Sequence, residues 1–432
     1  MDEKIQITTN ANESVLQPSW SPDNILYFVS DRSNWWNIYR WKEGEVKSVF
    51  AEDAEFAEEP WTFAKSNYDF ESKNRILCSY TKNGLWKIAR LNTETGEHEE
   101  IQTPYTYVSY LRTAPDYAVF IGASPTEAES IVKLDLNKLT TEVLKRSSEN
   151  TLESGYLSQP NPIIFPTEKG LTAHGIYYKP TNKDYEAPAG TLPPLLVYVH
   201  GGPTATVYGT LYLKVQFWTS RGLAVLEVNY GGSTGYGREY RERLLGQWGI
   251  VDVDDSVNAA KYLVDRGEVD KEKLAIRGGS AGGYTTINSL TFRDVFKAGA
   301  SYYGISNLET FAADTHKFES RYLEFLVGLY PEKIDLYRQR SAINFLNQLN
   351  VPMIIFQGLE DKIVPPNQAE LIVEALRKRG KPVAYLTFEG EQHGFRQAKN
   401  IKRSLEAELF FYSQIFGFTP ADSIEPVEIE NL

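Results

Sequence analysis

Apolar runs of strand length alternate with helix-like stretches through the second half of the chain. The runs are rich in β-branched and aromatic residues. Near-continuous apolar strands that alternate with helices are typical of a parallel sheet covered on both faces. We therefore expect an α/β domain built on a doubly wound, mostly parallel sheet. The runs are LLVYVH, LAVLEVNY, KLAIRG, AGASYYG, PMIIFQG and VAYLTFE, and the helix-like stretches include 252–265, 282–292, 367–379 and 398–414.

The first 150 residues have a different texture, with short strands joined by turns. Three hairpin-like units follow one another, and their turns are DRSN, KNG and PTEAE. Trp36 and Trp86 occupy matching places in the first two units, and the interval between them fits the ~40–50-residue repeat of four-stranded propeller blades. We expect about three propeller blades here, with an antiparallel β-sandwich as the alternative.

The change of texture divides the sequence into domains. We expect a partial β-propeller over residues 1–155, the α/β domain over 156–418 and a polar tail over 419–432. Because the tail is polar and contains proline, we expect it to be disordered. The acidic stretch 51–60 is expected to be a solvated loop, and the aspartates of 252–255 are expected to cap the helix that follows them.

The composition excludes several classes of function. With 45 basic and 57 acidic side chains the formal net charge is −12, which argues against a nucleic-acid partner held by phosphate contacts. No apolar run approaches the roughly 20 residues that span a bilayer, and the polar start lacks the pattern of a secretory signal. Cys78 is the only cysteine, so intrachain disulfides and cysteine-type zinc sites are excluded. We expect a cytoplasmic protein with no membrane partner, no metal and no other cofactor.

Glycines flank a single serine in the segment IRGGSAGGY, which follows the apolar run KLAIR. Gly278, Ser280 and Gly282 fit the pattern G-x-S-x-G, and the strand before it and the helix after it make the pattern a nucleophile elbow. The turn is so tight that side chains two positions before and after the serine would collide, which explains the two glycines. We predict that Ser280 is a nucleophile; the alternative is a glycine-rich turn without chemistry.

A serine nucleophile needs an acid and a histidine, which follow it in that order in folds with this elbow. Only His316 and His393 come after Ser280. We predict that His393 is the base, because it lies in a polar, glycine-flanked loop after the last apolar run, and that His316 is a surface or pocket residue. Asp361 lies just after the run PMIIFQG and is the predicted acid, with the adjacent Glu360 as the alternative.

The same chemistry requires donors for the oxyanion that forms when the serine attacks a carbonyl. The segment YVHGGPT ends the third strand of the α/β domain, where such folds offer a backbone N–H beside the elbow. We assign the N–H groups of Gly202 and Ala281 as the two donors, each worth roughly 2.7–4 kcal/mol in the transition state. His200 is expected at most to shape this loop. The segment 229–237, NYGGSTGYG, lacks the lysine of a phosphate loop and is interpreted as a substrate-side loop.

Together these motifs resemble the prolyl oligopeptidase family of serine peptidases, and within it the acylaminoacyl-peptidase and dipeptidyl-aminopeptidase-like branch. The resemblance implies an α/β-hydrolase fold preceded by a β-propeller, and oligopeptide substrates. It implies that Ser280, Asp361 and His393 are the catalytic residues and that Gly202 is the oxyanion glycine. The motifs are HGGPT, NYGGSTGYG, GQWGIVDVDD, RGGSAGGY, HKFESRY, GLEDKIVPP and GEQHGF, with WSPDNILYFVSDRSNWWNIYRW in the first half.

The resemblance also implies an aromatic substrate pocket formed by the segment after the elbow helix. Tyr303 and Tyr322 are the candidates, and ordinary core packing is the alternative for both. Members of the family commonly carry seven blades, whereas this sequence has room for about three. An incomplete propeller would leave open β edges. A truncated gene model, a cloned fragment and a short form that covers its edges in a homo-oligomer are the three explanations, and we favour truncation.

These inferences lead to one expected function with two alternatives. We expect a serine peptidase that hydrolyses short peptides through an acyl-enzyme intermediate. A carboxylic-ester hydrolase would use the same three residues. A non-catalytic binding or scaffold protein is the alternative from a different class, motivated by the small number of blades.

Overall fold

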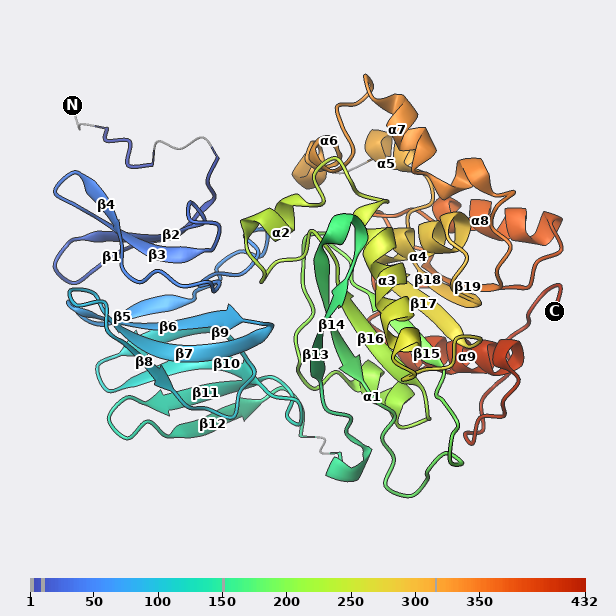
Figure 1. Cartoon of the computed structure of the whole chain (residues 1–432), viewed down its shortest axis with the longest axis horizontal. Coiled ribbons are helices and arrows are strands. Elements are labelled where there is room, and N and C mark those ends of the chain that lie inside the picture. Colours follow the sequence, from blue (N-terminus) through green and yellow to red (C-terminus); the bar gives the residue numbers. More distant parts are fainter. Residues whose placement is uncertain (1–3, 9–11, 150–151, 315–316) are drawn as a thin grey trace. The chain divides into compact units, whose positions relative to one another are not determined.

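The chain divides into two compact units, and each unit is formed by segments that are distant in sequence. Unit 1 comprises Met1–Ser154, Tyr208–Tyr212 and Ser233–Glu242, and unit 2 comprises Gly155–Val207, Leu213–Gly232 and Arg243–Leu432. The computed structural model describes residues 4–8, 12–149, 152–314 and 317–432 (Figure 1). Within these residues no helix has both the length and the apolar character to cross a membrane.

In its described residues unit 1 has three four-stranded antiparallel sheets, and in each sheet the strands pair in chain order. The three hairpin units expected from the sequence each fall in one of these sheets. The first sheet contains β1 (Val15–Trp20), β2 (Leu26–Ser30), β3 (Asn37–Lys42) and β4 (Glu45–Ser48). The second contains β5 (Tyr68–Ser72), β6 (Arg75–Lys82), β7 (Leu85–Asn92) and β8 (His98–Ile101). The third contains β9 (Tyr107–Ala114), β10 (Tyr117–Ala123), β11 (Ser130–Asp135) and β12 (Thr141–Arg146).

Neighbouring sheets of unit 1 share apolar cores. Trp36 and Ile38 of the first sheet region pack with Ile76 of the second in one cluster. Trp86 of the second sheet packs with Phe120 of the third in another. Since each sheet buries apolar residues against the next one, none of the three is stable by its own two faces alone.

The acidic stretch 51–60 of unit 1 is not the solvated loop that the sequence predicted. The side chains of Glu55 and Glu58 are fully buried. Arg241 forms an ion pair with Glu55 at 3.1 Å, and the N–H of Gly237 donates to the same carboxylate at 3.0 Å. Burial raises the pKa of Glu55, and the charge of Arg241 opposes that rise. The prediction is wrong because the residues that satisfy this carboxylate come from a segment far along the chain, including α2 (Arg238–Glu242).

Unit 2 is built on one eight-stranded sheet with the order β13-β14-β16-β15-β17-β18-β19-β20. Strands β13 and β14 pair antiparallel, β14 pairs antiparallel with β16, and the remaining pairs are parallel. This confirms the expected doubly wound, mostly parallel sheet. The strands are β13 (Asn161–Pro166), β14 (Thr172–Tyr178), β15 (Leu195–Val199), β16 (Ala224–Asn229), β17 (Leu274–Gly279), β18 (Ala298–Tyr302), β19 (Met353–Gly358) and β20 (Val383–Phe388).

Helices cover both faces of this sheet. On one face, Trp218 of α1 and Phe411 of α9 share a core with Ala298 of β18. On the other face, α4 reaches β18 at Gly299, where an added Cβ would meet Leu290, because successive strand residues point to opposite faces. The helices of unit 2 are α1 (Leu213–Thr219), α3 (Val251–Asp265), α4 (Ala281–Phe292), α5 (Leu308–Asp314), α6 (Tyr322–Leu326), α7 (Ile334–Gln339), α8 (Asn367–Lys378) and α9 (Ala398–Phe416). Short 3₁₀ turns are η1 (Ser154–Tyr156), η2 (Glu168–Gly170), η3 (Lys317–Glu319) and η4 (Ala342–Phe345).

The prediction that the aspartates of 252–255 cap a helix is wrong. Asp252 and Asp254 lie inside the first turn of α3 and Asp255 directly follows that turn, and the N-terminus of the helix has no side-chain cap. Asp252 is completely buried. It accepts the N–H of Gly249 at 2.6 Å and the hydroxyl of Thr285 at 2.5 Å. This carboxylate therefore ties the loop before α3 to the elbow helix α4.

The polar tail 419–432 is ordered on unit 2, contrary to the expectation of disorder. Glu430 forms an antiparallel bridge with Val383 of β20, and its carboxylate pairs with Arg377 at 2.6 Å. Val427 is buried against the core under α9. The tail is held because its backbone pairs with the edge strand β20 at one position and because Val427, with Ile424 and Ile429, packs on the core, despite the polar composition of the segment.

Candidate active site

Ser280 lies at the sharp turn between β17 and α4. Its backbone has φ 57° and ψ −122°, a conformation that L-residues rarely adopt. The N–H of Ser280 donates to the carbonyl oxygen of Tyr302 on β18 at 3.0 Å, which helps to hold this strained residue in place. The geometry is that of a strand–turn–helix elbow, as the pattern G-x-S-x-G predicted.

The glycines around Ser280 are required by close backbone packing. A Cβ on Gly278 would lie 2.3 Å from the carbonyl carbon and oxygen of Gly282. A Cβ on Gly283 would lie 2.6 Å from the Cα of Gly304. Real Cβ contacts do not reach such distances, so the elbow and the loop after β18 can approach only without these side chains.

His393 connects Ser280 with Asp361. Its Nε2 lies 2.8 Å from the Oγ of Ser280, and its Nδ1 lies 2.8 Å from an oxygen of Asp361. Because an ionised carboxylate only accepts hydrogen bonds, Nδ1 carries the proton and Nε2 is left to accept the serine O–H. Three side chains that are far apart in sequence thus form one hydrogen-bonded path.

The loop after β19 fixes the carboxylate of Asp361. One carboxylate oxygen accepts the N–H groups of Ile363 and Val364, each at 2.9 Å. The other oxygen is the one that faces His393. The Asp361 side chain is fully buried, so these bonds compensate for its burial. The adjacent Glu360 is exposed, so the structure brings Asp361 to the histidine. His316 lies outside the described residues.

Glu391, which the sequence analysis did not single out, anchors the loop that carries His393. It is 1% exposed and accepts the N–H groups of Arg396 and Gln397, each at 2.9 Å, and the side-chain amide of Asn400 at 2.8 Å. Burial acts to raise its pKa, but these hydrogen bonds leave the pKa lowered. The available signal was a glutamate two residues before the histidine in the motif GEQHGF.

The predicted oxyanion donors, Gly202 and Ala281, lie in the loop after β15 and at the start of α4. The loop after β15 passes against it, since a Cβ on Gly201 would lie 3.1 Å from the carbonyl oxygen of Gly279 and 3.5 Å from the Cβ of Ser280. Gly202 follows with φ 120°, in the region that favours glycine. Ala281 is the first residue of α4, and the first N–H groups of a helix have no partner within it.

The two predicted pocket tyrosines lie close to the site in different ways. The ring of Tyr303 meets the imidazole of His393 edge-on, with centroids 4.9 Å apart. Burial raises the pKa of Tyr303. The hydroxyl of Tyr322 lies 2.6 Å from that of Thr204, in the loop that carries Gly202, and burial raises the pKa of Tyr322 to about 12. Both tyrosines therefore contact residues of the candidate site.

A buried ion pair lies behind the elbow. Arg277 of β17 and Glu408 of α9 are 3.1 Å apart, and both are almost fully buried. The hydroxyls of Tyr302 and Tyr412 donate to Glu408 at 2.6 and 2.9 Å. Burial raises the pKa of Glu408, and the charge of Arg277 opposes the rise. These contacts hold β17, β18 and α9 together next to the serine.

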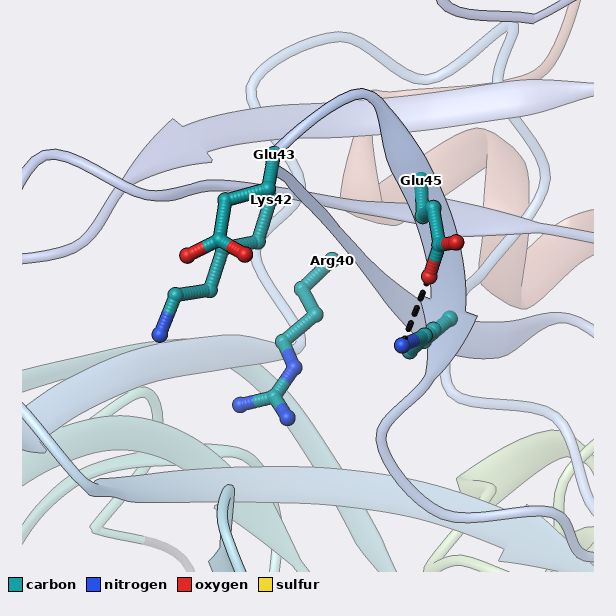
Figure 2. Close-up of a pocket in the computed structure, with 5 residues that line it drawn as sticks. Arg40, Lys42, Glu43 and Glu45 are labelled. Atoms are coloured by element: carbon teal, nitrogen blue, oxygen red, sulfur yellow. Dashed lines mark ion pairs between the residues drawn. The ribbon is translucent and has the colours of Figure 1, made fainter.

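A surface hollow on the β3–β4 hairpin of unit 1 is lined by none of the candidate site residues described above. Arg40, Lys42, Glu43, Glu45 and Lys47 line it, and Lys47 pairs with Glu45 at 2.7 Å (Figure 2). Its lining residues are charged, mostly exposed and confined to one hairpin, so we do not assign it to the candidate site. In the part of the chain that the structure describes, no group of three or more His, Cys, Asp or Glu side chains is placed to hold a metal ion.

The serine lies on a strand–helix elbow at the carboxyl edge of a mostly parallel sheet. It is hydrogen-bonded to a histidine, which is hydrogen-bonded to an aspartate. This arrangement defines an α/β-hydrolase. Residues 210–419 match the family model described as "Prolyl oligopeptidase family". This part of the chain is a domain of the prolyl oligopeptidase family of serine peptidases, as the sequence motifs predicted.

Relatives of this chain include enzymes that are considerably longer. Dipeptidyl aminopeptidase BIII from Pseudoxanthomonas mexicana is 34% identical over 55% of this chain and 35% of its own length. Dipeptidyl peptidase family member 6 from Caenorhabditis elegans is 30% identical over 78% of this chain and 46% of its own length. A puromycin-hydrolyzing peptidase from Mycobacterium tuberculosis is 41% identical, with a TM-score of 0.94 over 98% of this chain and 65% of that chain. The chain thus spans less than half of these two curated relatives.

Proposed function

We propose that this chain is a serine peptidase that hydrolyses amide bonds in short peptides. The observation that carries the proposal is the path of two 2.8 Å hydrogen bonds from Ser280 through His393 to Asp361. A serine hydroxyl is a weak nucleophile by itself and needs such a base and an orienting acid. The strained elbow supports the same role, because it presents the hydroxyl at the edge of the sheet where ligands of α/β folds bind.

In the proposed mechanism Ser280 attacks the peptide carbonyl while His393 accepts its proton. Asp361 keeps the imidazole in the required tautomer and stabilises its charged form. The N–H groups of Gly202 and Ala281 donate to the developing oxyanion. His393 then gives its proton to the leaving amine, and water, deprotonated by the same imidazole, releases the acyl group from the serine.

The substrate class is part of the proposal. The names of the relatives, a dipeptidyl aminopeptidase and a puromycin-hydrolyzing peptidase, support short peptides and aminoacyl compounds as substrates. We place Tyr303 and Tyr322 in the pocket for the residue that is acylated, which is supported by the contact of Tyr303 with the imidazole and of Tyr322 with Thr204. The proposal requires no cofactor or metal.

A fluorophosphonate probe and a set of aminoacyl-nitroanilides test the function. The wild-type protein should be labelled and should release nitroaniline, and Ser280→Ala should do neither. Ser289→Ala is the matched control: this serine is on α4, the helix that begins after Ser280, it is completely buried, and its hydroxyl has no hydrogen-bond partner among the described residues. Equal labelling of wild type and Ser280→Ala would disprove the assignment. Turnover of nitrophenyl esters without turnover of any nitroanilide or peptide would favour a carboxylic-ester hydrolase instead.

Three further points belong to the proposal. The sheets of unit 1 are proposed to be propeller blades, supported by their four-stranded meander and by the cores that successive sheets share. A cytoplasmic location is supported by Cys78, a buried free thiol, and cell fractionation would test it. A homo-oligomer that covers open β edges remains a prediction, which light scattering would test.

A further inference from the structure

The loop that carries Gly202 is held by Asn229 and Tyr230, two consecutive residues at the end of β16. Asn229 holds its far end: the side-chain oxygen accepts the N–H of Val207 at 2.8 Å and the hydroxyl of Thr206 at 3.0 Å. The side-chain amide of Asn229 also donates to the carbonyl oxygen of Val207 at 3.2 Å. The loop is therefore fixed at 206–207 by three hydrogen bonds to one side chain.

Tyr230 holds the part of the loop around Gly202. It is completely buried. Its hydroxyl donates to the carbonyl oxygen of Pro203 at 2.8 Å, and the carbonyl oxygen of His200 lies 3.3 Å from the same hydroxyl. These two carbonyls lie on either side of Gly202 in sequence. The ring of Tyr230 also stacks on the imidazole of His200, with centroids 4.4 Å apart and an interplanar angle of 17°.

The imidazole of His200 in turn fixes the peptide group that contains the N–H of Gly202. Its Nδ1 lies 2.7 Å from the carbonyl oxygen of Gly201. A carbonyl only accepts, so Nδ1 is the donor. The C=O of Gly201 and the N–H of Gly202 belong to one planar trans peptide, in which they point in opposite directions. Holding the carbonyl on one side therefore sets the direction of the N–H on the other.

We propose that Tyr230 and His200 are positioning residues that aim the N–H of Gly202 at the oxyanion formed on attack by Ser280. The inference rests on the proposed function, since only acyl transfer creates that oxyanion. Two consecutive glycines allow the peptide between them to rotate easily. An oxyanion donor lowers the barrier only when it is oriented in advance. The stacked pair supplies that orientation through hydrogen bonds to the backbone of the loop.

His200 donates to the carbonyl of Gly201 as a neutral imidazole. Burial lowers its pKa to about 4, although the bond to the carbonyl of Gly201 opposes the shift. The imidazole therefore keeps one N–H and no positive charge throughout the pH range in which a histidine base is active. It offers the carbonyl a fixed neutral donor and leaves the charge balance at Ser280 unchanged.

The test compares binding of a transition-state analogue with binding of the substrate. Tyr230→Phe removes the hydroxyl and keeps the stacking ring. We expect kcat for an aminoacyl-nitroanilide to fall about tenfold, and the inhibition constant of a matching peptide aldehyde, which forms a tetrahedral adduct with the serine, to rise by the same factor. KM should stay within about twofold. Tyr337→Phe is the control, because Tyr337 is equally buried and its hydroxyl donates to the carbonyl of Gly328 at 2.7 Å.

A pair of His200 variants tests the donor itself. His200→Leu removes the N–H and should lower kcat by about a hundredfold, close to the loss of one oxyanion donor. His200→Asn keeps an N–H near the position of Nδ1 and should recover most of that loss. The proposal is overturned if aldehyde affinity is unchanged, if it changes only in step with KM, or if Tyr337→Phe has the same effect. A wild-type protein that is neither labelled nor active would instead refute the proposed function, and the inference with it.

Discussion

A methyl group on Gly282 would lie 2.2 Å from the carbonyl oxygen of Val199. Val199 ends β15 and Gly282 is in the first turn of α4. The strand that leads to the loop of Gly202 and the helix that begins after Ser280 therefore meet with no room for a side chain. The second glycine of the pattern G-x-S-x-G exists because of this contact between two backbones.

Gly282→Ala should be strongly destabilising. The added carbon meets a backbone atom, which cannot move aside as a flexible side chain can, so we expect a loss of about 3 kcal/mol or more in the free energy of unfolding. Urea denaturation measures it. Gly380→Ala is the comparison: its Cβ would have open space, and only φ +61° opposes the change, which should cost about 1 kcal/mol. Similar losses for the two variants would contradict this account.

Asp361→Asn should abolish most activity with little change in stability. The oxygen that accepts the N–H groups of Ile363 and Val364 is retained, so the new NH₂ group faces His393. The imidazole must then accept a hydrogen bond at Nδ1 and carry its proton on Nε2. A protonated Nε2 cannot accept the proton of Ser280. We expect kcat to fall by about 10⁴-fold, measured with an aminoacyl-nitroanilide. Glu360→Gln should retain full activity, and a loss of less than tenfold for Asp361→Asn would argue against the assigned role.

Glu391→Ala should impair catalysis by loosening the loop of His393. Its three hydrogen bonds tie this loop to the start of α9. We expect stability to fall by about 2–4 kcal/mol and kcat to fall by about 10- to 100-fold. Glu391→Gln should be intermediate in stability and in kcat, because the amide keeps only one of the two acceptor oxygens. Stopped-flow labelling by a fluorophosphonate would report the change at Ser280, and an unchanged labelling rate in Glu391→Ala would contradict the prediction.

Asp252→Asn should stabilise the protein at neutral pH but not in acid. Burial raises the pKa of Asp252 from 3.8 to about 6. The carboxyl group of Asp252 therefore ionises at a lower pH in the unfolded chain than in the folded protein. The buried charge lowers the free energy of unfolding as the pH rises from about 4 to 6. At pH 8 the cost approaches about 3 kcal/mol. An amide can donate to the hydroxyl of Thr285, whose own proton can go to the carbonyl oxygen of Ala281 at 3.2 Å.

Thermal unfolding at several pH values checks this prediction. The advantage of Asp252→Asn should be near zero at pH 4 and should grow through pH 6. Asp254→Asn is the control, because that carboxylate is in the same turn but pairs with Arg293 near the surface, where an ion pair contributes about 1 kcal/mol or less. An advantage for Asp252→Asn that is the same at every pH would show that the carboxylate is not the source of the effect.

The sequence alone predicted the elbow, its partners and the type of sheet. Each of these leaves a local pattern: glycines two positions from Ser280, apolar runs of strand length, and polar residues directly after those runs. Since parallel strands end at the same edge of a sheet, the order of the runs is enough to bring Asp361 and His393 near the serine. The choice between Asp361 and Glu360 followed only weakly from spacing, and it is Asp361 that the loop places against His393, while Glu360 is exposed.

Only the tertiary structure decided which charged and polar residues are buried and what they hold. Glu55 was expected to be solvated and is buried because Arg241 reaches it from another part of the sequence. Asp252 was expected to cap a helix and is instead buried between α3 and α4, and Tyr230 gave no local signal of its contacts. Local patterns follow from backbone geometry and the separation of apolar from polar side chains, which act over a few residues. The stability of a buried polar group depends on whether a partner arrives from elsewhere, and folding alone determines that.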